Sequence, residues 1–258
     1  MVSISLPKNS KFTKGNYYKA KNPKKLKKIN VYRWNPDKKV NPTIDTFEID
    51  LNNCGQMVLD ALILIKDKID SSLTFRRSCR EGVCGSCSMN IDGINTLACQ
   101  KNIKEIKGDI NIFPLTHLPV IKDLVVDLSH AFKQLEFIEP WLQNNLDQPT
   151  KNEQQQLLNE RSKIEGLWEC ILCFCCTTSC VSYWWNGEKY LGPAALLQAS
   201  RWVNDSRDQE KKKRLKQIEK NSNIHNCHSI MNCANSCPKG LNPAKAIVDL
   251  KKQIATNI

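Results

Sequence analysis

No apolar stretch of this 258-residue sequence is long enough to cross a membrane as a helix. Outside the cysteine-rich segments the longest uninterrupted apolar run is residues 61–65, whereas a spanning helix needs roughly 18 apolar residues. If the protein works at a membrane, we therefore expect it to sit on the surface through partners. The composition, 41% hydrophobic and 25% charged, is typical of a globular protein and argues against a disordered chain.

The first 30 residues contain no acidic side chain. They hold nine lysines and therefore carry +9 of the net charge of +12. Because the basicity is confined to one end, we expect a solvated extension over residues 1–28, with an arm for nucleic acid or anionic lipid as the alternative. No apolar segment follows as in a secretory signal, and the absence of Arg before Arg33 weakens the case for a mitochondrial transit peptide.

The apolar residues divide the chain into two unlike parts. In the first part, alternation predicts five strands, at residues 29–34, 46–51, 88–92, 95–99 and 109–115. A helix at 57–68 and an extended piece at 73–75 lie between them. The second part is helical, with helices expected at 124–137, 194–203, 205–220 and from Pro243 onward, and a surface helix or connector at 152–165. We expect an α+β protein, with a sheet domain over residues 29–125 and an all-α domain over residues 126–258.

Thirteen cysteines are the most distinctive feature of the chain, and four of them form a first group, at Cys79, Cys84, Cys87 and Cys99. The spacing C-x4-C-x2-C…C is that of a plant-type 2Fe-2S site. Gly82 and Gly85 let the loop bend around a small cluster, and its N–H groups can offset negative charge on the sulfurs. Three arginines add positive charge that should raise the reduction potential, namely Arg76, Arg77 and Arg80.

A structural zinc site is the alternative for this group, because Cys84-x2-Cys87 alone would suit zinc. The gap of four residues is unusual for zinc, and the hairpin that follows carries one cysteine instead of a second pair. The spacing therefore favours the cluster. In the alternative interpretation the arginines are solvated surface charges.

A second group of cysteines is split over two segments. The first segment has the bacterial ferredoxin spacing C-x2-C-x2-C-x3-C, at Cys170, Cys173, Cys176 and Cys180. The second repeats this spacing with one cysteine missing and ends in Cys-Pro, at Cys227, Cys233 and Cys237. Ile230 stands where the missing cysteine would be, and Val181 stands where the first segment would have its proline.

In two-cluster ferredoxins the fourth cysteine of each run binds the other cluster. Crossing the two runs gives a complete 4Fe-4S ligand set, Cys170, Cys173, Cys176 and Cys237. The other set is one thiolate short and predicts a 3Fe-4S cluster, on Cys180, Cys227 and Cys233. Of the two cysteines left over, we expect Cys54 to be an ordinary buried or turn thiol and Cys175 to pack near a cluster.

Three different clusters form a path for single electrons rather than a catalytic pocket. The sequence lacks a P-loop, a G-x-G-x-x-G fingerprint and a convincing Ser-His-Asp constellation. We therefore expect the chain to receive electrons from a partner's two-electron cofactor and to pass them to an acceptor.

These motifs resemble the iron–sulfur subunit of succinate dehydrogenase, respiratory complex II. The resemblance covers about residues 30–255 and is carried by RRSCREGVCGSC from Arg76, CILC from Cys170, WWN from Trp184 and CHSIMNC from Cys227. It implies a plant-type ferredoxin-like (β-grasp) domain followed by an all-α bacterial ferredoxin-like domain. It also implies that electrons run from FAD in a flavoprotein subunit, which oxidises succinate to fumarate, through the 2Fe-2S, 4Fe-4S and 3Fe-4S clusters to ubiquinone. This is a step of the tricarboxylic acid cycle and of the respiratory chain.

The resemblance further implies membrane-anchor subunits of the cytochrome b type beside the 3Fe-4S end. The subunit would be peripheral on the inner membrane, facing the cytoplasm of an alphaproteobacterium or the mitochondrial matrix. Part of the ubiquinone pocket would come from this chain, at Trp185, Trp184, His228 and Ile230. An indole N–H can donate to a quinone carbonyl, and a histidine can carry a proton. Alternatively, the tryptophans bury a helix end against the anchor, and Val181 in place of the family's Pro leaves the shape of the pocket edge open.

Three other functions compete with this interpretation. The iron–sulfur subunit of a menaquinol-linked fumarate reductase would run the same chemistry backwards, although the Cys175-Cys176 pair and WWN resemble the dehydrogenase more. A zinc-stabilised nucleic-acid binder would use the lysine-rich extension and residues 211–216, and would be colourless. A free-standing ferredoxin would lack the flavoprotein partner. The cysteine spacings favour the dehydrogenase subunit, with no nucleic-acid partner.

Overall fold

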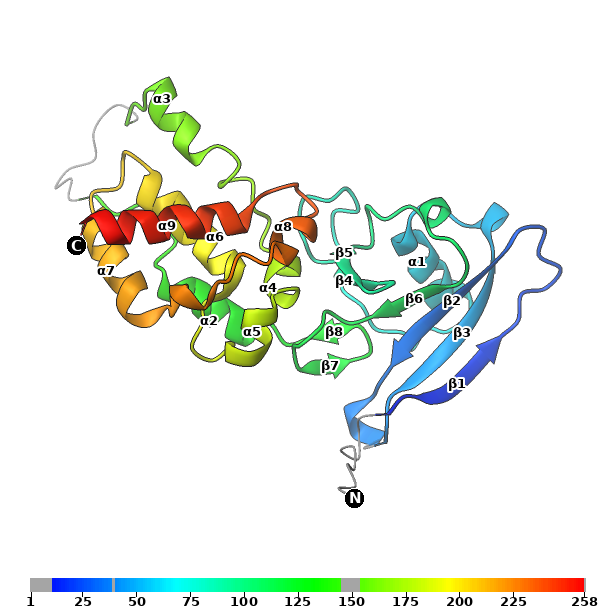
Figure 1. The fold of residues 1–258 in the computed structure, drawn as a ribbon. Coiled ribbons are helices and arrows are strands. Elements are labelled where there is room, and N and C mark those ends of the chain that lie inside the picture. Colours follow the sequence, from blue (N-terminus) through cyan, green and yellow to red (C-terminus); the bar gives the residue numbers. More distant parts are fainter. Residues whose placement is uncertain (1–10, 39, 145–153, 258) are drawn as a thin grey trace, which may run out of the picture. The chain divides into compact units, whose positions relative to one another are not determined.

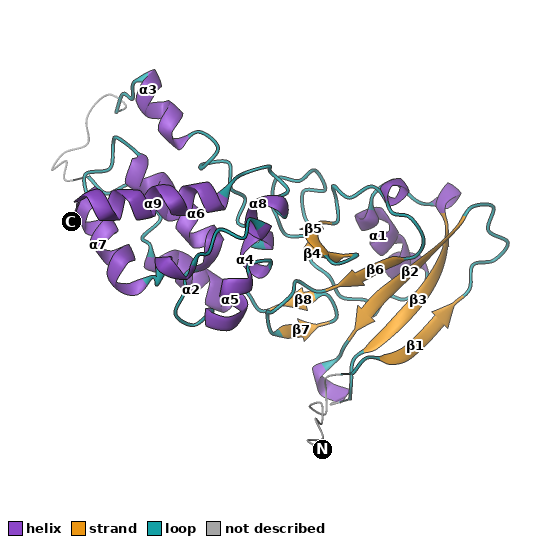
Figure 2. Cartoon of the chain, in the orientation of Figure 1, coloured by secondary structure: helices purple, strands orange, loops and turns teal. Residues whose placement is uncertain are grey.

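The computed structural model describes residues 11–38, 40–144 and 154–257, and the chain divides into two compact units between Asp127 and Leu128 (Figure 1). The first unit contains a sheet and one α-helix, and the described part of the second unit contains helices and loops (Figure 2). The sequence predicts a boundary at residues 125–126. The architecture is mixed α+β, as expected.

Six strands of the first unit form one mixed sheet, in the order β1-β3-β2-β6-β4-β5. Strand β2 runs antiparallel to β3 and parallel to β6, while β4 runs antiparallel to both β5 and β6. The strands are β1 (Thr13–Tyr18), β2 (Leu26–Arg33), β3 (Thr43–Asp50), β4 (Ser88–Ile91), β5 (Ile94–Leu97) and β6 (Ile110–Phe113). A separate hairpin pairs β7 (Val120–Lys122) with β8 (Val125–Val126). Short 3-10 turns lie at Pro36–Lys38, Leu51–Asn53 and Ile103–Glu105.

Alternating burial builds the core of this unit. Ile29 and Val31 of β2 and Phe47 and Ile49 of β3 are buried, while their neighbours along each strand are partly exposed. Helix α1 (Val58–Lys68) supplies the opposing apolar surface, with Val58, Leu59, Ala61, Leu62 and Ile65 buried. This sheet-and-helix core supports the loop between α1 and β4, which carries three of the cysteines.

The predicted solvated extension over residues 1–28 is wrong for residues 13–18, which form strand β1, and for residues 26–28, which begin strand β2. Strand β1 pairs in parallel with β3. The Tyr18 ring stacks on Phe47 with centroids 4.6 Å apart, and the Asn16 N–H donates to Asp45 Oδ1 at 2.8 Å. The lysines of the segment do not prevent pairing because its aromatic side chains supply the packing. Residues 1–10 lie outside the described residues.

Helices α6 and α9 form the centre of the second unit. Leu196 and Val203 of α6 pack with Ile247 and Leu250 of α9 in one buried cluster. The α-helices are α2 (Ser129–Phe137), α3 (Leu158–Arg161), α4 (Cys175–Thr178), α5 (Val181–Asn186), α6 (Gly192–Asn204), α7 (Lys211–Asn221), α8 (Asn232–Asn235) and α9 (Pro243–Asn257). Two of the four-residue helices, α4 and α8, each carry a predicted ligand cysteine, Cys176 and Cys233.

One predicted helix is wrong in its extent. Residues 124–137 do not form one helix, because Asp123 adopts a left-handed conformation (φ 46°) that turns the chain into β8, and α2 begins only at Ser129. Over residues 152–165, where a surface helix or connector is expected, the structure has α3 and a 3-10 turn, Ser162–Ile164, with residues 152 and 153 outside the described part. The extended piece predicted at 73–75 forms no strand in the structure.

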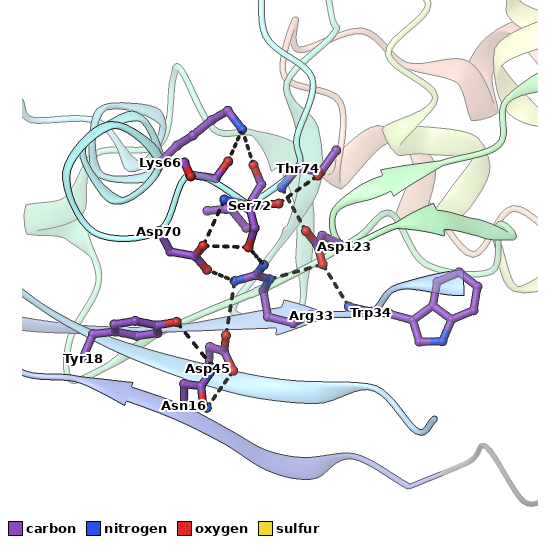
Figure 3. A network of polar contacts seen from close by, with 12 residues as sticks. Asn16, Tyr18, Arg33, Trp34, Asp45, Lys66, Asp70, Ser72, Thr74 and Asp123 are labelled. Carbon is purple, nitrogen blue, oxygen red and sulfur yellow. Dashed lines mark hydrogen bonds and ion pairs between the residues drawn. The ribbon is translucent and has the colours of Figure 1, made fainter. Parts of the chain in front are cut away.

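A network centred on Arg33 ties the segment before the cysteine loop to the sheet (Figure 3). The Arg33 guanidinium pairs with Asp70, lies 3.2 Å from Asp45 and 3.2 Å from Asp123, and is 87% buried at its side chain. Asp123 also accepts the Thr74 N–H at 2.9 Å. Residues 70–74 are thereby attached to β2 and β3, a few residues before the first cysteine of the loop.

Candidate metal centres

The loop over residues 79–87 brings backbone N–H groups to its sulfur atoms. The N–H groups of Val83 and Cys84 both donate to Cys79 Sγ at 3.3 Å, and the Cys79 N–H donates to Cys84 Sγ at 3.5 Å. The Ser86 hydroxyl lies 3.0 Å from Cys84 Sγ. These contacts favour negatively charged sulfur, as thiolate ligands require.

Positive φ angles let the loop close. Arg80, Gly82 and Gly85 have φ of 66°, 75° and 70°. The left-handed backbone at Gly82 favours glycine, and a Cβ there would also lie 2.0 Å from Gln100 Nε2, so the exposed Gln100 side chain would have to move. The glycine predicted to let the loop bend at position 82 is therefore explained by its left-handed backbone conformation.

The four cysteines of the first group form a chain of contacts that follows the sequence order. The Cys84 N–H donates to Cys79 Sγ, Cys84 acts electrostatically on Cys87, and Cys87 contacts Cys99. The Ser86 hydroxyl lowers the pKa of Cys84 to about 6, whereas burial raises the pKa of Cys87 to about 12. Two thiols are thus near the surface and two are inside. This donor set fits a small cluster that has one buried side and one side close to solvent.

A cavity in the second unit gathers all four thiols of the predicted 4Fe-4S set, which are Cys170, Cys173, Cys176 and Cys237. Its other walls include Phe174, Ala194 and Leu197, so the cavity is largely apolar. Burial, followed by the nearby Cys173 and Cys170 thiols, raises the pKa of Cys176 well above its usual value. A group that draws these thiols together as thiolates has to supply positive charge, which iron does.

Cys175, left over from the ligand count, is fully buried beside this cavity. Hydrogen bonding by the Cys175 thiol lowers the pKa of Cys173, so Cys175 acts as the donor to a predicted ligand. Cys54 is half-buried, and burial raises the pKa of its thiol to about 11. The expectations for both residues agree with these positions.

A second cavity of the same unit gathers the predicted 3Fe-4S set, Cys180, Cys227 and Cys233. Ile230 and His228 line it as well, together with Val181 and Tyr190. Cys233 lies inside α8, and burial raises the pKa of its thiol to about 11. Three thiols and the apolar Ile230 side chain, in place of a fourth thiol, fit a 3Fe-4S cluster, which has one iron fewer than a 4Fe-4S cluster.

The backbones of the two cysteine segments repeat one another. Leu172 and Phe174 flank Cys173 with left-handed φ of 52° and 58°, and Ser229 and Met231 flank Ile230 with left-handed φ of 55° and 71°. In each segment the second of these residues precedes a four-residue helix, α4 or α8. The position of the missing cysteine is thus visible in the conformation as well as in the spacing.

The predicted quinone residues differ in exposure. The Trp185 side chain is 82% exposed and that of Ile230 is 52% exposed. Trp184 is 37% exposed, and its indole N–H donates to the Thr178 carbonyl at 2.7 Å. His228 is exposed beside Cys227. The two tryptophans therefore have different environments, one attached to its own domain and one turned to solvent.

Two further geometric findings apply to the described residues. Among residues 11–38, 40–144 and 154–257, no three His, Cys, Asp or Glu side chains converge on one position suited to a single metal ion. No helix in that part of the chain has the length and apolar character to cross a membrane.

Family comparisons agree with the two thiol-rich units. A model of the 2Fe-2S iron–sulfur cluster binding domain matches residues 28–133, and a model of the 4Fe-4S dicluster domain matches residues 169–242. The chain is similar to the succinate dehydrogenase iron–sulfur subunit of Paracoccus denitrificans, with 53% identity over 259 residues and full coverage of both chains.

Two solved structures share the fold. A chain of the Mycobacterium smegmatis Sdh1 complex in the apo form matches with a TM-score of 0.75 at 22% identity, over 90% of this chain and 96% of that chain. A hypothetical protein from Helicobacter pylori matches with a TM-score of 0.53 at 17% identity, over 88% of this chain and 39% of that chain. At these identities the matches establish the fold alone.

The sheet unit with its cysteine loop and the helical unit with its two thiol-lined cavities define an iron–sulfur protein of the two-ferredoxin-domain class. Full-length identity of 53% then decides the family within this class. The chain belongs to the family of succinate dehydrogenase iron–sulfur subunits. The fumarate reductase alternative is not favoured by these comparisons.

Proposed function

We propose that this chain is the electron-transfer subunit of succinate:ubiquinone oxidoreductase and carries one 2Fe-2S, one 4Fe-4S and one 3Fe-4S cluster. The bound clusters supply one-electron chemistry between FAD of a flavoprotein subunit and ubiquinone. The observation that carries the proposal is the grouping of eleven cysteines into three sets: three in the 79–87 loop with Cys99 beside them, four around one cavity and three around another. Each set has the number of thiols that its predicted cluster needs.

The protein's own residues hold and adjust these groups. Backbone N–H groups of the 79–87 loop neutralise thiolate charge, which stabilises the more negative, reduced state. In the helical unit, Cys176 and Cys233 belong to one buried cluster with Ala194 and Ala244. This closeness of the two cysteine sets supports direct electron transfer between them, without any mobile carrier.

The chain belongs to an assembly with a flavoprotein subunit and membrane-anchor subunits in general. We assign the anchor contact and part of the ubiquinone pocket to the 3Fe-4S side of the helical unit. The exposed apolar side chains of Trp185, Ile230 and Met231 support this assignment, because surfaces of this kind bind apolar partners. Trp185 is the proposed hydrogen-bond donor to the quinone, with Trp184, His228 and Ile230 around it. A peripheral position on the inner membrane, facing the cytoplasm or the mitochondrial matrix, is part of the same proposal.

Metal analysis and EPR of the anaerobically purified complex test the proposal. We expect about nine non-haem iron atoms per chain with matching acid-labile sulfide, and three distinct signals between the oxidised and reduced states. Cys170→Ser should remove the 4Fe-4S signal, whereas Cys54→Ser, at a half-buried thiol outside all three sets, should remove none. Zinc without acid-labile sulfide in the wild-type protein would refute the proposal.

A further inference from the structure

Tyr190 is the largest fully buried side chain among the described residues, with 0% exposure. It lies in the loop between α5 and α6, and its ring belongs to the apolar cluster that includes Leu196, Ile224 and Ile247. The ring is thus an ordinary part of the core. Its hydroxyl group is different.

The Tyr190 hydroxyl is buried and has no hydrogen-bond partner of adequate geometry among the described residues. A buried hydroxyl without a partner is destabilising, so folded proteins rarely leave one in this state. Tyr183 belongs to the same apolar cluster of side chains, and its hydroxyl is paired as usual, because it donates to Gln134 Oε1 at 2.9 Å. By contrast, the hydroxyl of Tyr190 forms no hydrogen bond of adequate geometry with the described residues, although the Cys227 thiol lies beside it.

The position of the side chain indicates where an acceptor lies. Tyr190 lines the cavity that gathers Cys180, Cys227 and Cys233. A phenol has an ordinary pKa of about 10, so the hydroxyl is a neutral donor at physiological pH. The lining residues offer sulfur as the neighbouring acceptor, with Cys227 beside the hydroxyl.

We propose that Tyr190 donates a hydrogen bond to a sulfur atom of the cluster held by Cys180, Cys227 and Cys233, and thereby raises its reduction potential. The inference rests on the proposed function, since it requires a cluster at this site. A donor stabilises the more negative, reduced state more than the oxidised state, which makes the cluster easier to reduce. Tyr190 is a positioning and tuning residue, and no electron or proton passes through it.

Tyr190→Phe in the intact complex tests the proposal, because it removes one oxygen and leaves the ring. We expect the midpoint potential of the 3Fe-4S signal, measured by EPR-monitored redox titration, to fall by up to about 59 mV. That shift is a tenfold change in the ratio of oxidised to reduced cluster for a one-electron couple. The EPR signal of the oxidised cluster should also lose one exchangeable deuteron coupling in D2O.

Tyr183→Phe is the matched control. It removes a buried hydroxyl from the same apolar core, and that hydroxyl already has a protein acceptor, Gln134. It should leave both the potential and the deuteron coupling unchanged. A 3Fe-4S signal with the wild-type potential and coupling in Tyr190→Phe would overturn the inference while leaving the proposed function intact. Absence of the signal from the wild-type complex would instead refute the proposed function.

Discussion

Ile230 occupies, in the segment after Cys227, the backbone position that Cys173 occupies in the segment after Cys170. Each lies three residues after the first cysteine of its segment and between two residues of left-handed conformation. The second of these two residues immediately precedes a short helix. The two segments therefore share one conformation and differ in the side chain at this position. The difference of one thiol decides how many irons each segment can help to hold.

Ile230→Cys should convert the 3Fe-4S cluster into a 4Fe-4S cluster, because the new thiol begins from a backbone already shaped like that around Cys173. The fourth thiolate adds negative charge, so the potential of the site should fall. Low-temperature EPR of the oxidised complex checks this, since the 3Fe-4S signal should be lost. Ile230→Val keeps the apolar character and should keep the signal. An unchanged spectrum in the cysteine variant would contradict the equivalence of the two positions.

The cysteine sets are the part of the site that could be predicted from the sequence. Ligand spacing is a local property, because a few residues between two thiols fix how they can face one centre. The structure gathers the same sets of thiols, and their ligation of clusters stays a prediction. Tyr190 could not be found in this way. Its hydroxyl becomes a candidate donor only through the packing of α6, α9 and the cysteine segments, for which no spacing or motif is diagnostic.

The fold shows the same division between local and long-range information. The strands β2 and β3 and helix α1 follow from alternation and helical periodicity, and they lie within a few residues of their predicted bounds. Strand β1 was not predicted because it lies in the lysine-rich N-terminal segment. Its stability comes from the packing of Tyr18 against Phe47 and from pairing with β3. The β7–β8 hairpin was not predicted because residues 124–126 are apolar and continue the hydrophobic pattern of helix α2, which follows them.

The ion pair between Arg80 and Asp60 should adjust the 2Fe-2S potential in a direction set by which partner is removed. Arg80 Nη2 lies 3.0 Å from Asp60 Oδ1, and the Arg80 side chain is 56% exposed. Arg80→Gln removes positive charge beside the cysteine loop and should lower the potential. Asp60→Asn leaves Arg80 uncompensated and should raise it.

Because solvent screens this pair, each effect should be about 1 kcal/mol at most, which is less than the roughly 59 mV of a tenfold change. EPR-monitored redox titration of the 2Fe-2S signal measures both shifts. Asp37→Asn, at an exposed carboxylate of the segment between β2 and β3, is the control for a general charge effect. Shifts of the same sign in Arg80→Gln and Asp60→Asn would count against a charge mechanism.

Arg33→Met should destabilise the sheet unit far more than Arg80→Gln does. Arg33 is largely buried and faces three carboxylates, Asp45, Asp70 and Asp123. Removal of the common partner of buried charges costs about 3–5 kcal/mol, whereas an exposed pair contributes about 1 kcal/mol or less. Hydrogen exchange of the amides in β3 and residues 70–76 of the intact complex measures the local free energy of opening. Equal protection in the two variants would show that the network does not hold the segment.

Trp185→Leu should slow quinone reduction while leaving succinate oxidation by an artificial dye largely intact. The indole of Trp185 is exposed, so its loss should not disturb the domain, and a lost hydrogen bond of about 1.4 kcal/mol corresponds to roughly a tenfold weaker interaction. Parallel assays with ubiquinone and with the dye separate the last step from the earlier ones. Trp184→Phe is the contrasting variant, because it breaks the bond to the Thr178 carbonyl within the domain. We expect it to impair assembly, with both activities reduced together. If Trp185→Leu also lowered both activities equally, its indole would serve the packing of the complex and the quinone assignment would fail.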